Sequence, residues 1–284
     1  MNALHEKSVT FAAPAKINLM LRVVGRRADG YHLLQTVFRF IDFGDELRFS
    51  LRQDGVMTRA DPLPTVPSEE DLCVRAAKAL QRYSQTRMGA DIWLKKRIPM
   101  GGGLGGGSSD AATTLVALNH LWDTRLTRIQ LIEIAEKLGA DVPVFVWGRS
   151  AFAQGIGEQL EAITLDPAWY IVLIPPVAVS TASIFNHPEL KRDSQKVTIQ
   201  GFTAKNMLLL GNDLQTLVCK LYPVVGSYLD WLGQHAPVAM SGSGACVFAH
   251  FDDENSAKAV FAKRPAQMQG FVARGLDCHP LLAI

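Results

Sequence analysis

The feature that most constrains this chain is a glycine-rich segment between two regularly patterned stretches. Residues 99–112 read Pro-Met-Gly-Gly-Gly-Leu-Gly-Gly-Gly-Ser-Ser-Asp-Ala-Ala and include six glycines. A strand-like run at 92–98 precedes the segment. Apolar residues at helical spacing follow it: Ala111, Ala112, Leu115, Leu118 and Trp122. The segment is therefore predicted to be a loop that leads from a strand into a helix.

A loop of this composition has the chemistry of an anion site. Glycine has no Cβ, so its backbone can adopt positive φ and bring N–H groups close to a ligand. Ser108, Ser109 and Asp110 are predicted to cap the start of the helix. Backbone donors and the positive end of a helix dipole together favour a phosphate.

Three other interpretations of the glycines fit less well. Gly101, Gly103 and Gly106 have dinucleotide-fingerprint spacing, but that motif needs an acid about twenty residues later, at the end of a second strand. The next acid, Asp123, lies at the end of the predicted helix. A Walker loop would need Gly-Lys-Ser/Thr, and a flexible linker would have polar flanks. A phosphate-binding loop is the preferred interpretation.

Composition limits the classes of partner. The 284 residues are 48% hydrophobic and 20% charged, with a net charge of +2, which is typical of a globular protein and predicts no nucleic-acid partner. Residues 1–10 are polar, and no apolar run has membrane-spanning length. Neither a zinc site nor a disulfide framework is indicated, and a cytoplasmic location is predicted, because the cysteines are scattered singly: Cys73, Cys219, Cys246 and Cys278.

In the first half, residues 11–24 alternate between apolar and polar side chains, which places Lys16 and Asn18 on one face of a strand. Asp29-Gly30 predicts a hairpin turn. Further strands are expected at 33–41 and 47–51, a loop at 53–68 and a helix at 71–83. Thr127-x-x-Gln130 predicts a capping box for a helix through Leu138.

The second half is also mixed. A strand is expected at 169–175, a helix at 213–235 broken at Pro223, a short strand and then the loop Ser241–Gly244. A strand at 245–251, a helix at 254–263 and a strand at 270–274 follow. This mixture predicts an α+β protein of two domains, at residues 1–157 and 158–284.

Together, several motifs resemble one enzyme family. The glycine segment is similar to the phosphate-binding motif of the GHMP kinases, named for galactose, homoserine, mevalonate and phosphomevalonate kinases. Four other stretches resemble the branch that phosphorylates a cytidyl diphosphate derivative of methylerythritol in the non-mevalonate route to isoprenoids. They are Pro14-Ala-Lys-Ile-Asn-Leu19, Ala28-Asp-Gly-Tyr-His32, Ala140-Asp-Val-Pro-Val-Phe145 and Ser241-Gly-Ser-Gly-Ala-Cys246.

The resemblance implies a fold, ligands and residue roles. The fold is an N-terminal glycine-loop domain and a C-terminal ferredoxin-like domain, with the active site in the cleft between them. ATP is the implied phosphoryl donor, Mg²⁺ is expected, and the protein is expected to be a monomer or weak homodimer. Asp141 is the implied base, and Lys16 is its partner. The implied ATP-binding residues are Pro99, Met100, Gly101, Gly102, Gly103, Leu104, Gly105, Gly106, Gly107, Ser108 and Ser109.

The implied acceptor-binding residues are more dispersed. Asn18 is expected near the methylerythritol end, Tyr31 and His32 at the cytosine, and Thr181 and Phe185 on the opposite wall. The resemblance also suggests Lys96 and Asp71 for the adenine pocket. Asp110 occupies a position where relatives vary between Asn and Asp, and it could attract Mg²⁺ or only start a helix.

Some alternatives stay open at this point. Ser241–Gly244 could approach the phosphates or the substrate from the second domain, or be a tight turn between strands. Each site residue alone would be an ordinary strand, turn or core residue, and only their joint match to one pattern favours a role. The competing functions are a GHMP kinase for another small alcohol, a nucleotide-binding protein without turnover, and a dinucleotide oxidoreductase.

Overall fold

The computed structural model describes residues 9–61, 66–67, 69–198 and 204–283. The predicted loop at 53–68 and the polar segment at 1–10 therefore fall partly outside the described residues. The first half contains the following elements: β1 (Val9–Arg26), β2 (His32–Arg52), β3 (Met57–Arg59), α1 (Leu72–Ser84), β4 (Gly89–Lys95), α2 (Gly106–Leu121), α3 (Arg128–Ala135), α4 (Val142–Trp147), β5 (Ala151–Gly155) and β6 (Gln159–Ala162).

The second half contains β7 (Trp169–Ile174), α5 (Thr181–Asn186), α6 (Ala204–Leu208), α7 (Gln215–Leu221), α8 (Pro223–Gly233), β8 (Val238–Met240), β9 (Val247–Phe251), α9 (Glu254–Phe261), β10 (Gln269–Leu276) and the 3₁₀ helix η1 (Pro280–Ala283). Its strands lie side by side in the order β10-β7-β9-β8, and all neighbours are antiparallel. Helices connect β7 to β8 and β9 to β10, which gives the βαββαβ topology of a ferredoxin-like fold.

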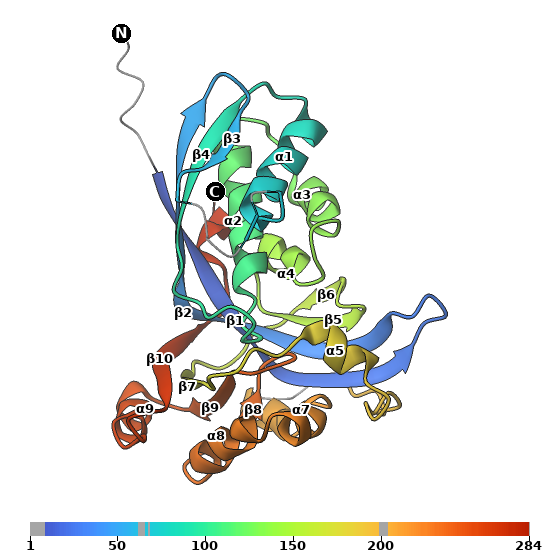
Figure 1. Cartoon of the computed structure of the whole chain (residues 1–284), viewed down its shortest axis with the longest axis vertical. Coiled ribbons are helices and arrows are strands. Elements are labelled where there is room, and N and C mark those ends of the chain that lie inside the picture. Colours follow the sequence, from blue (N-terminus) through green and yellow to red (C-terminus); the bar gives the residue numbers. More distant parts are fainter. Residues whose placement is uncertain (1–8, 62–65, 68, 199–203, 284) are drawn as a thin grey trace.

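One sheet joins the two halves. β2 pairs with β1, β4 and β5 in the first half, and β10 pairs with both β2 and β7. Figure 1 shows α1–α4 gathered against β1–β4, with α7–α9 beside β7–β10 at the other end of the molecule. The α+β fold class is therefore confirmed, whereas the boundary between residues 157 and 158 stays a prediction.

The two strands expected at 33–41 and 47–51 are one strand, β2, so that prediction is wrong. Gly44 had suggested a break between them. It instead lies opposite Pro14 in the β1–β2 ladder, where the β1 backbone leaves no room for a Cβ. The register shifts between Pro14 and Lys16 and again between Asn18 and Met20, which marks bulges in β1.

Most expected helices are present with shifted ends. Asp71 caps α1 through its side chain, and Thr127 and Gln130 form the predicted capping box of α3, which ends at Ala135 rather than Leu138. The strand expected at 92–98 is β4 and ends at Lys95. The sequence interpretation missed the short elements β3, β5, β6, α4, α5 and α6. Within the described residues, no helix has the length and apolarity to span a membrane.

Three buried clusters hold the fold. The first lies under α1–α4 and the second under α7–α9. A third combines Ile17 and Leu19 of β1 with Leu104 of the glycine loop and Tyr170 and Phe248 of the second half. Burial of apolar side chains is the main favourable contribution to folding, so this third cluster packs the two halves against each other.

Candidate active site

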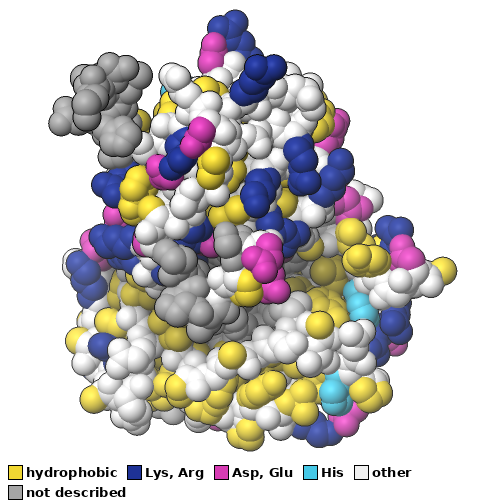
Figure 2. All heavy atoms as spheres, turned by 45° about the horizontal axis from the view of Figure 1, so that its top comes forward, with side chains coloured by type: hydrophobic (Ala, Val, Ile, Leu, Met, Phe, Trp, Pro, Cys, Tyr) yellow, Lys and Arg dark blue, Asp and Glu magenta, His cyan; other side chains and the backbone are white. Residues whose placement is uncertain are grey.

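A cleft of about 580 Å³ lies where the two halves meet. Figure 2 shows the surface hollowed there, with dark blue Lys and Arg side chains gathered on the part above the hollow. Glycine-loop residues 99–108 line it, together with residues of β1, β2, α5 and the loop between β8 and β9. The cleft therefore brings the phosphate-loop motif next to most of the predicted acceptor residues.

The helix after the glycine loop begins at least three residues earlier than predicted. α2 starts at Gly106, its N-cap is Gly105 with φ +73°, and no side chain caps it. The expected cap by Ser108, Ser109 or Asp110 is therefore wrong. The Ser109 hydroxyl, which is fully buried, instead donates to the Pro14 carbonyl at 2.7 Å. A glycine N-cap brings no side chain to the first-turn N–H groups, which suits an anion.

Both halves hold the glycine loop. The Lys16 backbone N–H donates to the Leu104 carbonyl at 3.0 Å, and the Cys246 N–H donates to the Gly102 carbonyl at 3.1 Å. The Ser241 hydroxyl donates to the Gly103 carbonyl at 2.8 Å. Gly103 has φ +74°, and a Cβ there would collide with the Ser241 carbonyl. The expected turn at Ser241–Gly244 is present, and it contacts the glycine loop, whereas its approach to phosphates or substrate stays a prediction.

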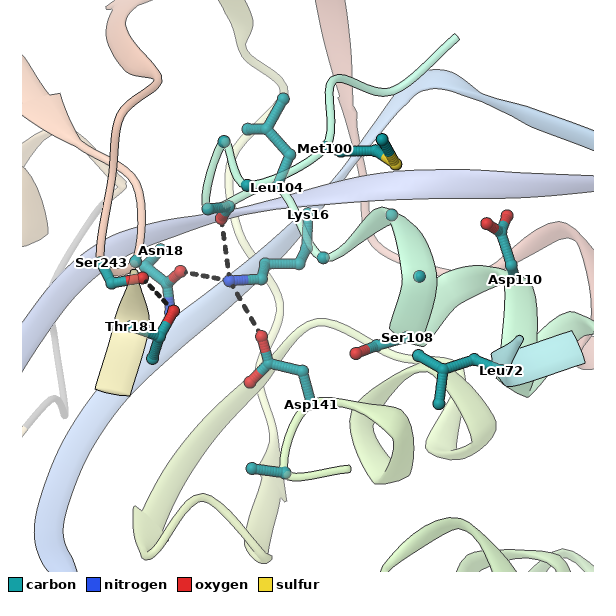
Figure 3. A pocket seen from close by; sticks show the side chains of 18 of the residues that line it. Lys16, Asn18, Leu72, Met100, Leu104, Ser108, Asp110, Asp141, Thr181 and Ser243 are labelled. Atoms are coloured by element: carbon teal, nitrogen blue, oxygen red, sulfur yellow. Dashed lines mark hydrogen bonds and ion pairs between the residues drawn. The ribbon is translucent and has the colours of Figure 1, made fainter. Parts of the chain in front are cut away.

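Lys16 is the centre of the polar network at the end of the loop (Figure 3). Its ammonium lies 3.2 Å from the Asp141 carboxylate, and it donates to Asn18 Oδ1 at 2.6 Å and to the Gly103 carbonyl at 3.0 Å. The Lys16 side chain is 3% exposed, whereas that of Asp141 is 36% exposed. Lys16 is thus fixed by three acceptors, and the carboxylate beside it is open to the cleft. The predicted proximity of Lys16 and Asn18 is confirmed.

Asn18 is oriented by a residue that the sequence interpretation missed. Asn18 Nδ2 donates to the Thr36 hydroxyl at 2.8 Å, and that hydroxyl donates to the Met20 carbonyl at 2.7 Å. A lysine ammonium only donates, so the Asn18 oxygen must face Lys16 and its nitrogen must face Thr36. Thr36 carried no distinctive signal in the sequence, because Gln35 and Arg39 are also polar residues of the same expected strand.

Asp141 occupies the N-cap position of the short helix α4, but its side chain makes no capping hydrogen bond. Val142 and Pro143 begin the helix and are both buried, and Val142 belongs to the first cluster. Packing of α4 therefore fixes the backbone at residue 141, and the carboxylate remains available to Lys16 and the cleft.

The predicted acceptor residues are only partly brought together. Thr181 and Phe185 of α5 line the cleft, and the Thr181 hydroxyl lies 2.6 Å from the Ser243 hydroxyl. The His32 ring packs on Phe185 with centroids 5.1 Å apart. Tyr31 is 61% exposed. Neither Tyr31 nor His32 is among the described residues that line the cleft, so the predicted sandwich of Tyr31 and Phe185 is not assembled here.

Sequence comparisons agree with this geometry. Residues 71–149 match the model of the GHMP kinase N-terminal domain, and residues 201–270 match that of the GHMP kinase C-terminal region. The 4-diphosphocytidyl-2-C-methyl-D-erythritol kinase of Nitrosospira multiformis is 58% identical over 95% of this chain and 92% of its own length. The chain belongs to the GHMP kinase family.

Solved structures of related kinases share the fold of this GHMP kinase. A crystal structure of 4-(cytidine 5'-diphospho)-2C-methyl-D-erythritol kinase superimposes with a TM-score of 0.82 and 31% identity, covering 94% of this chain and 99% of the other. The homoserine kinase of Cytophaga hutchinsonii superimposes with a TM-score of 0.68 at 17% identity, covering 96% of each chain, and shows the shared fold alone.

A second charged cluster of the kinase lies beside the glycine loop. The Lys96 ammonium bridges the carboxylates of Asp45, at 2.6 Å, and Asp110, at 2.9 Å. Burial, together with the nearby charge of Asp45, outweighs the effect of Lys96 and raises the pKa of Asp110 to about 8. Burial acts to lower the pKa of Lys96, but Asp110 and Asp45 outweigh it and raise that pKa.

Asp110 therefore makes stability depend on pH. The unfolded state loses this proton near the usual pKa of 3.8, whereas the folded state keeps it up to about 8. The contribution of Asp110 to the free energy of unfolding is therefore greatest in acid, and it is lost as the pH rises from 3.8 to about 8. We expect Asp110→Asn to reduce the fall in Tm between about pH 5 and pH 8, measured by thermal unfolding.

Asp123→Asn is the matched control for Asp110→Asn. Asp123 lies on the surface and is paired with Arg125, which lowers the pKa of Asp123, so it titrates below this window. If Tm falls with pH equally in the Asp110→Asn variant and in the unmodified protein, Asp110 is not the source of this pH dependence.

Proposed function

We propose that this kinase transfers the γ-phosphoryl group of ATP to the 2-hydroxyl of 4-diphosphocytidyl-2-C-methyl-D-erythritol, giving the 2-phosphate and ADP. Relatives named 4-diphosphocytidyl-2-C-methyl-D-erythritol kinase are 50–60% identical over most of both chains. The observation that carries the proposal is the Lys16–Asp141 ion pair at the end of the glycine loop. It places a carboxylate and a fixed ammonium where phosphate and acceptor would meet.

Phosphoryl transfer needs positioning and charge stabilisation more than covalent chemistry from the protein. The loop N–H groups and the start of α2 would hold the β- and γ-phosphates. Asp141 would take the proton from the tertiary hydroxyl as the oxygen attacks phosphorus and the bond to the ADP oxygen breaks. The ammonium of Lys16, which lies 3.2 Å from Asp141, would stabilise negative charge on the transferring oxygens.

We propose that Mg²⁺ accompanies ATP. Magnesium commonly binds through substrate phosphates, waters and one or two protein carboxylates, which requires no cage of protein ligands. Among the described residues no group of three or more His, Cys, Asp and Glu could hold a metal. The Ser108 hydroxyl and Asp110, whose Oδ1 is buried without a hydrogen-bond partner, are oxygen donors of the cleft on the nucleotide side. When bound, the metal would neutralise phosphate charge.

The roles of Lys96 and Asp71 at the adenine stay proposals. Lys96 lines the cleft beside the glycine loop, which supports a role for Lys96 at the adenine. Asp71 also lines it, but its Oδ1 accepts the N–H groups of Cys73 and Val74, and its Oδ2 pairs with buried Arg59. Asp71 is therefore better suited to fixing α1 beside the nucleotide than to binding the base.

We propose that the cytidyl group binds near α5, against Phe185 and Thr181, with Tyr31 and His32 closing over it. Tyr31 follows the hairpin turn between β1 and β2, and it is 61% exposed, so its ring has an open face that a base could cover. An aromatic ring stacked on a base contributes about 1–3 kcal/mol.

Tyr31→Ala is therefore expected to raise the KM for the cytidyl substrate by about five- to hundredfold and to leave the KM for ATP nearly unchanged. Steady-state kinetics with each substrate varied in turn measures both values. Tyr83→Ala, which removes an exposed tyrosine of α1, is the control. Equal changes in the two KM values would remove Tyr31 from the cytosine site.

Release of ADP from ATP and Mg²⁺ tests the activity itself. The acceptors are 4-diphosphocytidyl-2-C-methyl-D-erythritol, homoserine and mevalonate, each offered separately. Turnover with the first alone supports the proposal. Turnover with another alcohol would make this a GHMP kinase of different specificity, and ATP binding without transfer to any acceptor would indicate a nucleotide-binding protein.

We also propose that the kinase acts in the cytoplasm as a monomer or weak homodimer. The four cysteines are unpaired in the structure, which suits a reducing compartment. Sedimentation velocity over a range of concentrations measures the oligomeric state.

A further inference from the structure

Arg192, in the segment after α5, connects two parts of the proposed base-binding region. Its guanidinium donates to the Phe185 carbonyl at 3.0 Å and to the His187 carbonyl at 2.7 Å, at the end of α5. Its Nε donates to His32 Nε2 at 3.0 Å, at the start of β2. None of the ion pairs found in the described part of the chain involves Arg192. Its donors are thus used to fix neutral groups.

The bond to His32 determines where the imidazole carries its proton. A guanidinium only donates and stays charged, so His32 Nε2 must be an unprotonated acceptor. Turning the ring over would place a carbon opposite the Arg192 donor, so the contact also fixes the ring orientation. A neutral imidazole that accepts at Nε2 has its proton on Nδ1.

The surroundings of His32 favour the same neutral form. The side chain is 8% exposed. Burial, with further contributions from Arg192 and Arg26, lowers the pKa of His32. Nδ1 has no hydrogen-bond partner among the described residues, and the ring packs on Phe185, which lines the cleft. Within the described residues, the protonated nitrogen therefore has no protein acceptor.

We infer that Arg192 is a positioning residue that holds His32 as the Nδ1–H tautomer, so that the base-binding region offers a ring N–H donor. The inference rests on the proposed function. Cytosine N3 is an acceptor that can receive this N–H, whereas uracil N3 carries its own hydrogen and would oppose it. Arg192, which touches neither reacting group nor base in this scheme, thus contributes to the choice of cytidyl over uridyl substrates.

The first test observes the tautomer directly. Nitrogen-15 NMR of histidine-labelled protein, with His32 assigned by comparison with His32→Asn, should show Nδ1 protonated and Nε2 unprotonated at neutral pH. Arg192→Leu should move His32 toward the Nε2–H form or a mixture. A His32 that is already Nε2–H, or already doubly protonated, in the unmodified protein would overturn the inference without any variant.

The second test measures selectivity. The kcat/KM ratio between the cytidyl substrate and its uridyl counterpart should fall about ten- to hundredfold in Arg192→Leu, through KM for the cytidyl substrate and with little change in the KM for ATP. Arg192→Lys, which keeps the charge and one donor, should restore part of the selectivity and protects the test against a misfolded leucine variant. Lys191→Leu removes the neighbouring exposed cation and is the matched control.

A double substitution separates this role from simple support of α5. The amide nitrogen of asparagine can replace Nδ1–H without help from Arg192, so in a His32→Asn background Arg192→Leu should have little further effect on selectivity. A purely structural Arg192 would lower Tm and change selectivity equally in both backgrounds. Absence of all turnover with the cytidyl substrate would reject the proposed function, whereas normal turnover with unchanged selectivity in Arg192→Leu would reject only this inference.

Discussion

Asp141→Asn is expected to lower kcat by about 10²–10⁴-fold, because an amide cannot accept the proton of the attacking hydroxyl. Asp141 is open to the cleft and lies 3.2 Å from the Lys16 ammonium, and asparagine has nearly the same shape. The KM for ATP should change little, since the loop that we propose to hold the phosphates is untouched. Release of ADP under saturating substrates measures the effect.

Asp123→Asn provides the matched control for Asp141→Asn, since it makes the same chemical change at an exposed ion pair with Arg125. It should retain full activity. Near-normal turnover in Asp141→Asn would exclude Asp141 as the base, and the hydroxyl would then lose its proton without help from this side chain.

Lys16→Met is expected to lower kcat by about 10²–10³-fold, comparable to removal of one preorganised donor at a developing charge. Methionine can fill much of the volume of the buried side chain, but it leaves Asn18 Oδ1 and Asp141 without the ammonium. The lost contacts would also lower stability, so Tm must be measured on the same sample and turnover assayed well below it.

Lys95→Met is the control for Lys16→Met, because Lys95 is a lysine of β4 whose side chain is 70% exposed. The double variant with Asp141→Asn adds a further check. If Lys16 and Asp141 act as one unit, the two losses combine to far less than their product. Fully multiplicative losses would show that Lys16 acts on the phosphates independently of Asp141.

Local patterns predicted the parts of the site that depend on neighbouring residues. Strand periodicity placed Lys16 and Asn18 on one face, and glycine content identified the loop that leads into α2. Asp141 came only from the family resemblance, since a lone Asp after Gly-Ala has many ordinary uses. The start of α2 was predicted too late because serine and aspartate are good N-caps, whereas here Gly105 takes that position.

Local sequence patterns could not predict contacts between residues that are far apart in the sequence. Thr36 meets Asn18 because β1 and β2 pair, and Arg192 meets His32 across 160 positions of sequence. The break expected at Gly44 failed for a similar reason, since the close approach of β1, not a turn, requires glycine there. Contacts of this kind depend on strand register and on how the halves pack, which local periodicity does not encode.

Both halves of the chain hydrogen-bond to the glycine loop, which limits which segments can be exchanged between relatives. Ser241 and Cys246 belong to the second half, yet they donate hydrogen bonds to the Gly103 and Gly102 carbonyls of the first half. A chimaera that exchanged the second half with that of another relative would therefore replace part of the support of the glycine loop along with the proposed acceptor pocket. Exchange of acceptor specificity between relatives is thus better attempted at α5 and its neighbours, with residues 241–246 inherited together with the loop they support.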